Sequence, residues 1–175
     1  MTRSPWVAAL LMLVLVFVSG CTPAPQMSSD ERTIRTTIQR YNDLLIEGYR
    51  SLDMNPMQEV AAKLQAEDEY IHMSSLAEGG IRLDSELKKL EFVRVSVEAT
   101  SAQAETRETW DYRQYSRTTG KLVLEQKGLV YDLAWDFIRE PTGKWLVSDV
   151  RAISATTTVE PTTPGTITPV PPAGD

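Results

Sequence analysis

The chain has 175 residues with 18 basic and 24 acidic side chains, a formal net charge of −6, one cysteine and one histidine. The basic residues are scattered rather than clustered, which argues against nucleic acid and anionic lipid headgroups as partners. One cysteine allows no disulfide within the chain, and together with the single histidine, His72, it makes no Cys/His metal site. We expect no metal or other cofactor, and a domain stabilised by packing alone.

The N-terminus has the pattern of a secretory signal. The first five residues carry one positive side chain, Arg3, and an unbroken apolar run follows over 6–18. This run is shorter than the about 20 apolar residues of a membrane-spanning helix. With Gly20 just before Cys21, the segment resembles the lipobox of bacterial lipoproteins, which implies cleavage after residue 20 and a diacylglyceryl group on the Cys21 sulfur.

The lipobox resemblance also implies a location. A further acyl chain, such as palmitate, commonly follows on the new amino terminus, and two or more chains anchor a protein stably in a membrane. The protein is therefore expected in the cell envelope on the extracytoplasmic side, at the outer face of the cell membrane or in the outer membrane of a diderm. Cleavage removes Arg3 and leaves a net charge of −7. A plain cleaved signal, with Cys21 as a bystander, is the alternative.

After the signal of residues 1–20, one domain is expected. Residues 21–27 contain two prolines and predict an extended tether between the lipid and the domain. The domain itself is predicted over residues 28–153, the size of one ordinary folding unit. Residues 154–175 are rich in Thr and Pro with no lysine, arginine or aromatic residue, a composition that predicts a disordered tail. A spacer or a glycosylated stalk is the functional alternative for this tail.

The first part of the domain predicts helices. Ser28 and Glu31 have the spacing of a capping box. Apolar residues then recur at helical steps, at Ile34, Ile38, Tyr41, Leu45, Tyr49 and Leu52. A second helix is predicted to begin at Pro56, with Val60, Ala61 and Leu64 on its buried side. A third is predicted over 67–78, with Tyr70, Ile71, Met73 and Leu76 along one side.

The second part predicts antiparallel strands. Residues 92–100 alternate, with Val93, Val95, Val97 and Ala99 on one face. Residues 103–115 place Ala104, Thr106, Glu108, Trp110 and Tyr112 on one face and charged residues on the other. A return strand over 122–137 is interrupted by Gly128, where a bulge would fit, and a closing strand covers 144–153. Helices followed by an antiparallel meander predict an α+β domain.

This order of elements resembles the NTF2-like superfamily. The residues that carry the resemblance are Glu86-Leu87-Lys88-Lys89-Leu90-Glu91-Phe92, Glu108-Thr109-Trp110, Tyr131-Asp132-Leu133 and Gly143-Lys144-Trp145-Leu146-Val147. Within the superfamily the likeness is to the IMS-type domain of plastid-division proteins and bacterial relatives, over about Asn55 to Ile153. The resemblance implies a cone in which two to three helices pack on a curved antiparallel sheet of four to six strands.

Few side chains are candidates for chemistry in such a cone. An enzyme of the isomerase or cyclase kind would need an acid/base group in a dry pocket, and Glu108 is the one carboxylate predicted to face inward. The alternative places Glu108 at the rim of the sheet, or paired with an arginine such as Arg94 or Arg107. His72 has no spaced partner, so a surface or capping role is expected for it rather than catalysis.

Aromatic residues are expected to fill or line the cone. Together with Glu108 they form the candidate pocket: Tyr41, Trp110, Tyr112, Tyr131, Trp135 and Trp145. If these side chains fill the interior they are core, and if they do not they line a mostly apolar ligand cavity. The same alternation of residues fits both cases.

Two functions remain open from the sequence. The first is a lipid-anchored, non-catalytic NTF2-like domain that binds another envelope protein or itself. The second is a small-molecule binder or an isomerase-like enzyme that uses the pocket with Glu108 as acid/base. A spacer or structural lipoprotein is a third option. These options differ in whether the interior of the cone is available to a ligand.

Overall fold

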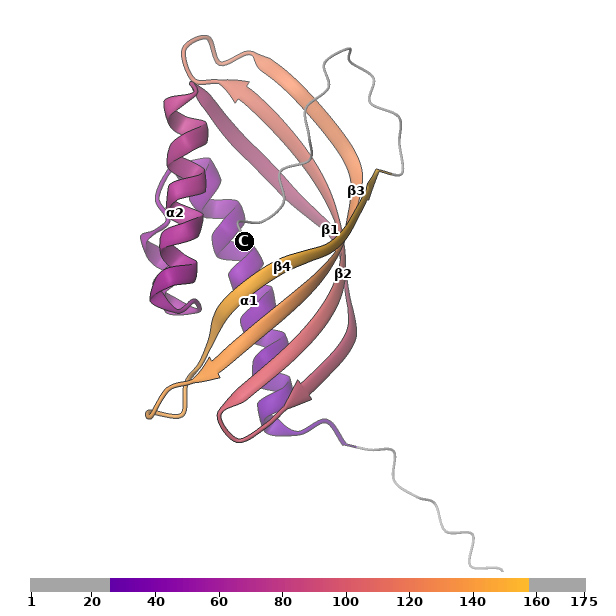
Figure 1. The fold of residues 1–175 in the computed structure, drawn as a ribbon. Helices are drawn as coiled ribbons and strands as arrows, with labels where there is room; N and C mark the ends of the chain where they lie inside the picture. Colours follow the sequence, from indigo (N-terminus) through magenta and orange to yellow (C-terminus); the bar gives the residue numbers. More distant parts are fainter. Residues whose placement is uncertain (1–25, 158–175) are drawn as a thin grey trace, which may run out of the picture.

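The computed structural model describes residues 26–157. In this range the predicted α+β architecture is confirmed: two α-helices and a short 3₁₀-helix precede four antiparallel strands. Both α-helices lie on the concave side of a strongly curved sheet (Figure 1). Cys21, the signal and most of the predicted tether lie outside the described residues, as does the tail from residue 158.

Helix α1 (Ser29–Ser51) is the long helix that crosses the sheet. Its N-terminus is capped as predicted, because the Ser28 Oγ accepts a hydrogen bond from the Glu31 backbone N–H at 3.0 Å. Ile34, Ile38 and Tyr41 are buried along its inner face. The helix ends at Leu52, which adopts the left-handed conformation, and the Leu52 N–H bonds the Gly48 carbonyl.

The predicted second and third helices differ from the structure. The residues after Pro56 form only the short 3₁₀-helix η1 (Asn55–Glu59), and one helix, α2 (Lys63–Glu78), replaces the remainder. Leu64, predicted to be buried, is 73% exposed. Tyr70 and Ile71, also predicted to face the core, are exposed as well. The predicted face was therefore wrong at Leu64, Tyr70 and Ile71, whereas Met73 is buried as predicted and Leu76 packs against the core.

The sheet is a simple meander in the order β1-β2-β3-β4. Its strands are β1 (Ile81–Val97), β2 (Ser101–Ser116), β3 (Leu122–Arg139) and β4 (Trp145–Thr157). Gly128, with φ +66°, lies at the register shift between β2 and β3, so the predicted bulge is confirmed. The start of β4 is covered by the chain before α2, since the Ala62 N–H bonds the Val147 carbonyl at 2.7 Å.

Two predictions for the strands need correction. A register shift between Phe92 and Arg94 turns Val93 outward, where it is 64% exposed, while Phe92 packs against the core. The clean alternation predicted for residues 92–100 is therefore wrong at Val93, because an inserted residue inverts the facing of side chains. At the other end of the domain, β4 extends to Thr157, past the boundary predicted at Ile153.

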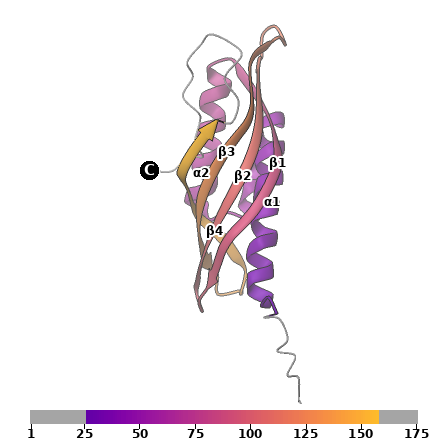
Figure 2. The same ribbon diagram turned by 90° about the vertical axis from the view of Figure 1, so that its right-hand side faces the viewer.

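The face of the sheet that points away from the helices carries paired charges. In the part of the chain that the structure describes, no helix covers this face (Figure 2). Arg94 bonds Glu105 at 2.7 Å, and Arg107 bonds Asp132 at the same distance. The Arg151 guanidinium bonds Asp136 at 2.8 Å. This face, which we call the outer sheet face, is therefore polar and largely neutralised by its own ion pairs.

Candidate functional site

Glu108 lies at the centre of the cone interior. The alternation of β2 points it inward beside Thr106 and Trp110, and its side chain is fully buried. Its Oε1 accepts hydrogen bonds from Asn42 Nδ2 at 3.2 Å and from the Thr106 hydroxyl at 3.0 Å. Its Oε2 accepts one from Trp110 Nε1 at 2.9 Å. The predicted inward position is confirmed, and the alternative of a rim or arginine-paired carboxylate is wrong.

The environment of Glu108 acts on its pKa in opposite directions. Burial raises the pKa of the carboxyl above its ordinary value, because the charged form is desolvated. The three donors, Asn42, Thr106 and Trp110, lower the pKa by stabilising the charge, but burial has the larger effect. The Thr106 hydroxyl also accepts a hydrogen bond from Trp135 Nε1 at 2.8 Å, so the carboxyl is part of a buried polar chain.

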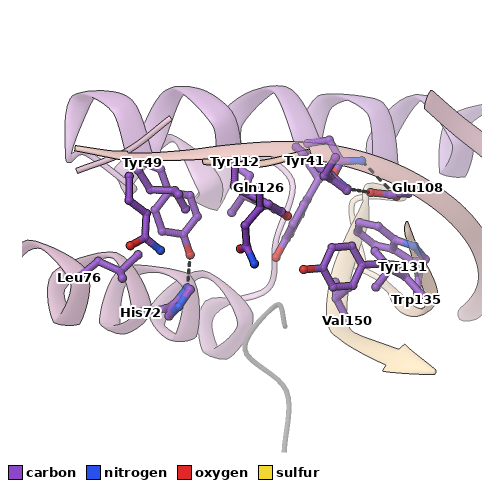
Figure 3. Close-up of a pocket in the computed structure, with 16 residues that line it drawn as sticks. Tyr41, Tyr49, His72, Leu76, Glu108, Tyr112, Gln126, Tyr131, Trp135 and Val150 are labelled. Atoms are coloured by element: carbon purple, nitrogen blue, oxygen red, sulfur yellow. Dashed lines mark hydrogen bonds between the residues drawn. The ribbon is translucent and has the colours of Figure 1, made fainter. Parts of the chain in front are cut away.

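A small cavity lies beside Glu108, between α1, α2 and the sheet (Figure 3). Its volume is about 60 Å³. By comparison, an engineered apolar cavity of about 150 Å³ binds benzene, and one water needs about 10 to 15 Å³. The cavity therefore has room for a few waters and is too small for a ring-sized substrate. Most of the cone interior is filled by the protein's own side chains.

Six of the seven predicted pocket residues line this cavity: Tyr41, Glu108, Trp110, Tyr112, Tyr131 and Trp135. The exception is Trp145, which is buried elsewhere, with its Nε1 3.4 Å from Asp30 Oδ1 and the Arg139 guanidinium over its ring. Of the two roles that the sequence left open, Trp145 therefore has that of a core residue rather than of a cavity wall. It faces inward from β4, but near the end of the sheet where α1 begins.

One polar group on the cavity wall is left over. The Tyr131 hydroxyl is buried and makes no hydrogen bond of good geometry among the described residues, although its interaction with the nearby Tyr112 hydroxyl lowers its pKa. In Figure 3 it points into the cavity. Burying a hydroxyl without a hydrogen bond costs free energy. A bound water, or a polar group of a ligand, would therefore be stabilised most by a hydrogen bond to this hydroxyl.

A second buried carboxylate, which the sequence interpretation missed, comes from α2. Glu69 is 1% exposed, and its Oε1 accepts a hydrogen bond from the Tyr41 hydroxyl at 2.6 Å. Its Oε2 accepts one from the Tyr49 hydroxyl at 3.3 Å, and Gln65 Nε2 donates to the Tyr41 oxygen at 2.8 Å. Burial raises the pKa of Glu69, against the lowering effect of these hydrogen bonds. Its only sequence signal was its helical spacing from Gln65 and Met73.

His72 also has a different place from the one predicted. Its ring is half-buried, lines the cavity and stands edge-on to Tyr49, with ring centroids 5.5 Å apart. The His72 Nδ1 forms a short hydrogen bond with the Tyr49 hydroxyl (Figure 3). Burial lowers the pKa of the imidazole, which favours its neutral form. The expected surface or capping role is therefore wrong, and His72 is a wall residue beside the Glu69 network.

In the observed arrangement, the Glu108 and Glu69 carboxyls have no oxygen free of a hydrogen bond to the protein that could act on a substrate. Both oxygens of Glu108 and both oxygens of Glu69 already accept hydrogen bonds from neighbouring side chains. Within residues 26–157, no group of three or more His, Cys, Asp or Glu side chains is placed to hold a metal ion. No helix in the same range is long and apolar enough to cross a membrane.

Comparisons with known proteins support the fold. The intermembrane space region of the chloroplast protein ARC6 aligns over 77% of this chain and 100% of its own, with a TM-score of 0.58 and 16% identity. An NTF2-like superfamily protein from Salmonella enterica aligns over 77% of this chain and 96% of its own, with a TM-score of 0.47 and 13% identity. A ketosteroid isomerase-like protein from Erwinia carotovora covers 73% and 99%, with a TM-score of 0.46 and 12% identity.

The domain therefore shares the fold of this ARC6 region, with two α-helices packed on an open four-stranded antiparallel sheet, and NTF2-like proteins are among the solved structures it is similar to. No model of a protein family matches the chain, and a search of curated proteins found no match either. The fold hosts enzymes and non-enzymes, so function has to be argued from the site.

Proposed function

We propose that this chain is a lipid-anchored cell-envelope protein whose NTF2-like domain is a non-catalytic module that binds another protein. The observation that carries the proposal is the filled cone. A cavity of about 60 Å³ has no room for a ring-sized organic substrate beside Glu108. The carboxyl itself is fully buried and accepts three hydrogen bonds from its own wall. Such a group supports the core rather than abstracting a proton from a ligand.

The envelope location rests on the sequence. Gly20 before Cys21, at the end of a short apolar run, is the basis for lipidation. An acidic domain tethered to a membrane would be repelled by anionic headgroups, which favours a protein rather than the lipid surface as its partner. Both a different envelope protein and a second copy of this chain are compatible with this function.

The proposal is tested by crosslinking in cells. The full-length anchored protein is treated with a membrane-permeable crosslinker, extracted in detergent and analysed by mass spectrometry. We expect one protein to recur at near-stoichiometric yield in the crosslinked material. Recovery of the uncrosslinked monomer alone would contradict the proposal.

A second function, binding of a small molecule in the cone, is favoured by the Tyr131 hydroxyl, which is buried without a hydrogen bond of good geometry. It requires the cavity to enlarge, for example by movement of Tyr49 and His72, which form part of its wall. Native mass spectrometry of the protein released from its own membranes would detect such a ligand as an added mass. The added mass should then be lost in Tyr131→Phe. An unmodified mass, or one that Tyr131→Phe leaves in place, contradicts this candidate.

A further inference from the structure

Helix α2 exposes two large apolar side chains and buries two polar ones beside Ala66 and Met73. Leu64 and Ile71 are 73% and 62% exposed, and they lie on one face of the helix because they are seven residues apart. The opposite face, which packs into the domain, buries Gln65 and Glu69. At Leu64, Gln65, Glu69 and Ile71 the helix therefore departs from the usual arrangement, in which the apolar residues of a surface helix face the core.

The buried polar residues fix this orientation. The Glu69 carboxylate is bonded by Tyr41 and Tyr49, which both come from α1, and Gln65 bonds the Tyr41 oxygen. Turning α2 by half a rotation would bury Leu64 and Ile71 but would break all of these hydrogen bonds and expose Ala66 and Met73. The chain therefore specifies the outward position of the apolar residues, at the expense of burying a carboxylate.

The exposed face of α2 is also acidic. Glu67 and Asp68 lie between Leu64 and Ile71, and Glu78 continues the same face towards the C-terminal end of the helix. Together these residues define a strip, which we call the α2 strip, with two apolar anchors about 10 Å apart along the helix axis. Lys63 is at the edge of the strip and pairs with Glu67 at 3.6 Å.

An open groove adjoins the strip. It has a volume of about 500 Å³ and lies between η1, α2 and the turn before β4. Its apolar lining is formed by Met54, Ala61, Ala66, Tyr70 and Leu146, and its polar lining by the carboxylates Glu67 and Glu140, the cation Lys63 and the amides Asn55 and Gln58. The groove offers a place for an apolar side chain of a partner that lies along α2.

We propose that the α2 strip and the adjoining groove are the docking surface for a basic amphipathic segment of another polypeptide. This inference rests on the proposed function and names the partner surface. Leu64 and Ile71 have the spacing at which an amphipathic helix presents its anchors, and Asp68 between them is complementary to lysine or arginine, as is Glu67, whose 3.6 Å pair with Lys63 is longer and more exposed than the pairs of the sheet.

Charge argues against a second copy of this chain as the occupant. Antiparallel packing of two α2 helices would match Leu64 of each copy with Ile71 of the other. The same symmetry places Glu67 of each copy against Asp68 of the other, at the centre of the interface. Four carboxylates would face each other there, and like charges suppress such a pairing.

The outer sheet face is a weaker candidate for docking. Its charges are already paired with each other, as in the Arg94–Glu105 and Arg107–Asp132 bridges. The exposed apolar side chain of Val93 lies among these pairs at 64% exposure, close to the exposure of Ile71. Val93 is therefore a matched control for the α2 strip.

A peptide titration tests the proposal. The probe is a fluorescent amphipathic peptide of about 18 residues, with leucines at i, i+3, i+4 and i+7 and lysines elsewhere. We expect it to bind the full-length protein in detergent, and Leu64→Ser/Ile71→Ser to raise its Kd about tenfold or more, as loss of central anchors does. Glu67→Gln/Asp68→Asn should raise the Kd and flatten its salt dependence.

Matched variants separate docking from general charge attraction. Val93→Ser removes an equally exposed apolar side chain, and Glu91→Gln/Glu105→Gln removes two charges from the sheet. Both should leave the Kd within about twofold, because surface changes outside a docking site have little effect on binding. Circular dichroism should show that all variants are folded, since the substituted side chains are on the surface.

Several results would overturn the docking surface. The first is that the control variants raise the Kd of the peptide as much as the α2 variants do. The second is that a peptide with glutamate in place of every lysine binds equally well. The third is that the wild type forms dimers and Leu64→Ser/Ile71→Ser abolishes them. If the peptide result fails but crosslinking in cells still recovers a partner, the docking surface is wrong and the proposed function stands. If crosslinking recovers no partner, the proposed function itself is wrong.

Discussion

At the scale of single residues, the interior contains two buried carboxyls, Glu108 and Glu69, that differ in their hydrogen-bond partners. Glu108 is bonded by an amide, a hydroxyl and an indole, whereas Glu69 is bonded mainly by two phenols. Phenol hydroxyls can turn to accept a hydrogen bond, and an indole N–H cannot. Substitutions around the two carboxyls should therefore have different effects on stability.

Thr106→Val tests the polar chain around Glu108. The substitution keeps the shape of the side chain but removes the hydroxyl that donates to Glu108 and accepts from Trp135. Trp135 Nε1 is then left buried without a partner, so we expect the free energy of unfolding to fall by about 1 to 3 kcal/mol. Urea denaturation measures this change. Thr109→Val, on the opposite face of β2, is the control, and equal effects of both substitutions would contradict the structural role of the chain.

Glu69→Gln tests the effect of the buried carboxyl on the pH dependence of stability. Burial raises the pKa of Glu69 above about 4.3, its ordinary value. At a pH between the ordinary pKa of the unfolded chain and the raised pKa of the folded protein, Glu69 has lost its proton in the unfolded chain but retains it in the folded protein. The free energy of unfolding of the wild type therefore falls as the pH rises through this range.

The Gln variant has no proton to release at residue 69, and the buried carboxyl of Glu108 is present in both proteins. We therefore expect the free energy of unfolding of Glu69→Gln, minus that of the wild type, to increase as the pH is raised from about 4 to 8. The increase should begin near the ordinary pKa of about 4.3. Free energies of unfolding at several pH values measure the difference. A constant difference would show that Glu69 has the same pKa in both states.

At the scale of elements, α1 and η1 approach closely at Gly48. A Cβ at this position would overlap the Met54 sulfur and come within 3.2 Å of the Asp53 carbonyl oxygen. Gly48→Ala would gain about 1 kcal/mol in helix propensity. The overlap is expected to outweigh this gain, with a net loss of about 1 to 3 kcal/mol in the free energy of unfolding.

Chemical denaturation measures the loss, and Gly79→Ala is the control for Gly48→Ala. At Gly79 a Cβ would meet only two carbonyl oxygens at 3.4 Å, and the backbone has an ordinary negative φ. We expect this second variant to be close to wild type. If Gly48→Ala is as stable as Gly79→Ala, the close contact between Gly48 and Met54 is not a constraint on the fold.

The elements also differ in how far the sequence could predict them. The inward face of β2 was predicted correctly, because strict alternation follows from the two-residue repeat of a strand. Leu64, Tyr70 and Ile71 of α2 were placed on the wrong side, although Met73 was placed correctly, because the orientation of the helix also depends on phenols that α1 contributes from a distant part of the chain. Val93 was misplaced because a bulge changes the register, and bulges leave little signal without a glycine.

At the scale of the whole molecule, the resemblance predicted the cone, but only coordinates could show that it is filled. Residue types and alternation are the same for packed and hollow cones, whereas the cavity of about 60 Å³ depends on how side chains from three elements fit together. The proposed docking strip and the proposed lipid anchor would together make a module that acts through its surface.

Anchoring is tested by Cys21→Ala. If Cys21 is the lipidation site, the variant should lose acylation and accumulate as an uncleaved or soluble form. Fractionation of cells into membrane and soluble material, with mass spectrometry of the N-terminal peptide, measures this. Equal membrane retention of a mature variant and the wild type would contradict lipidation at Cys21.

The central claim is that this domain works through its surface and not through the cone. The most direct test is crosslinking of the anchored protein in cells, with Leu64→Ser/Ile71→Ser compared against Tyr131→Phe. We predict that the wild type and Tyr131→Phe form the same adduct with an envelope protein and that the α2 variant does not. If the α2 variant keeps the adduct and Tyr131→Phe loses it, the claim is contradicted.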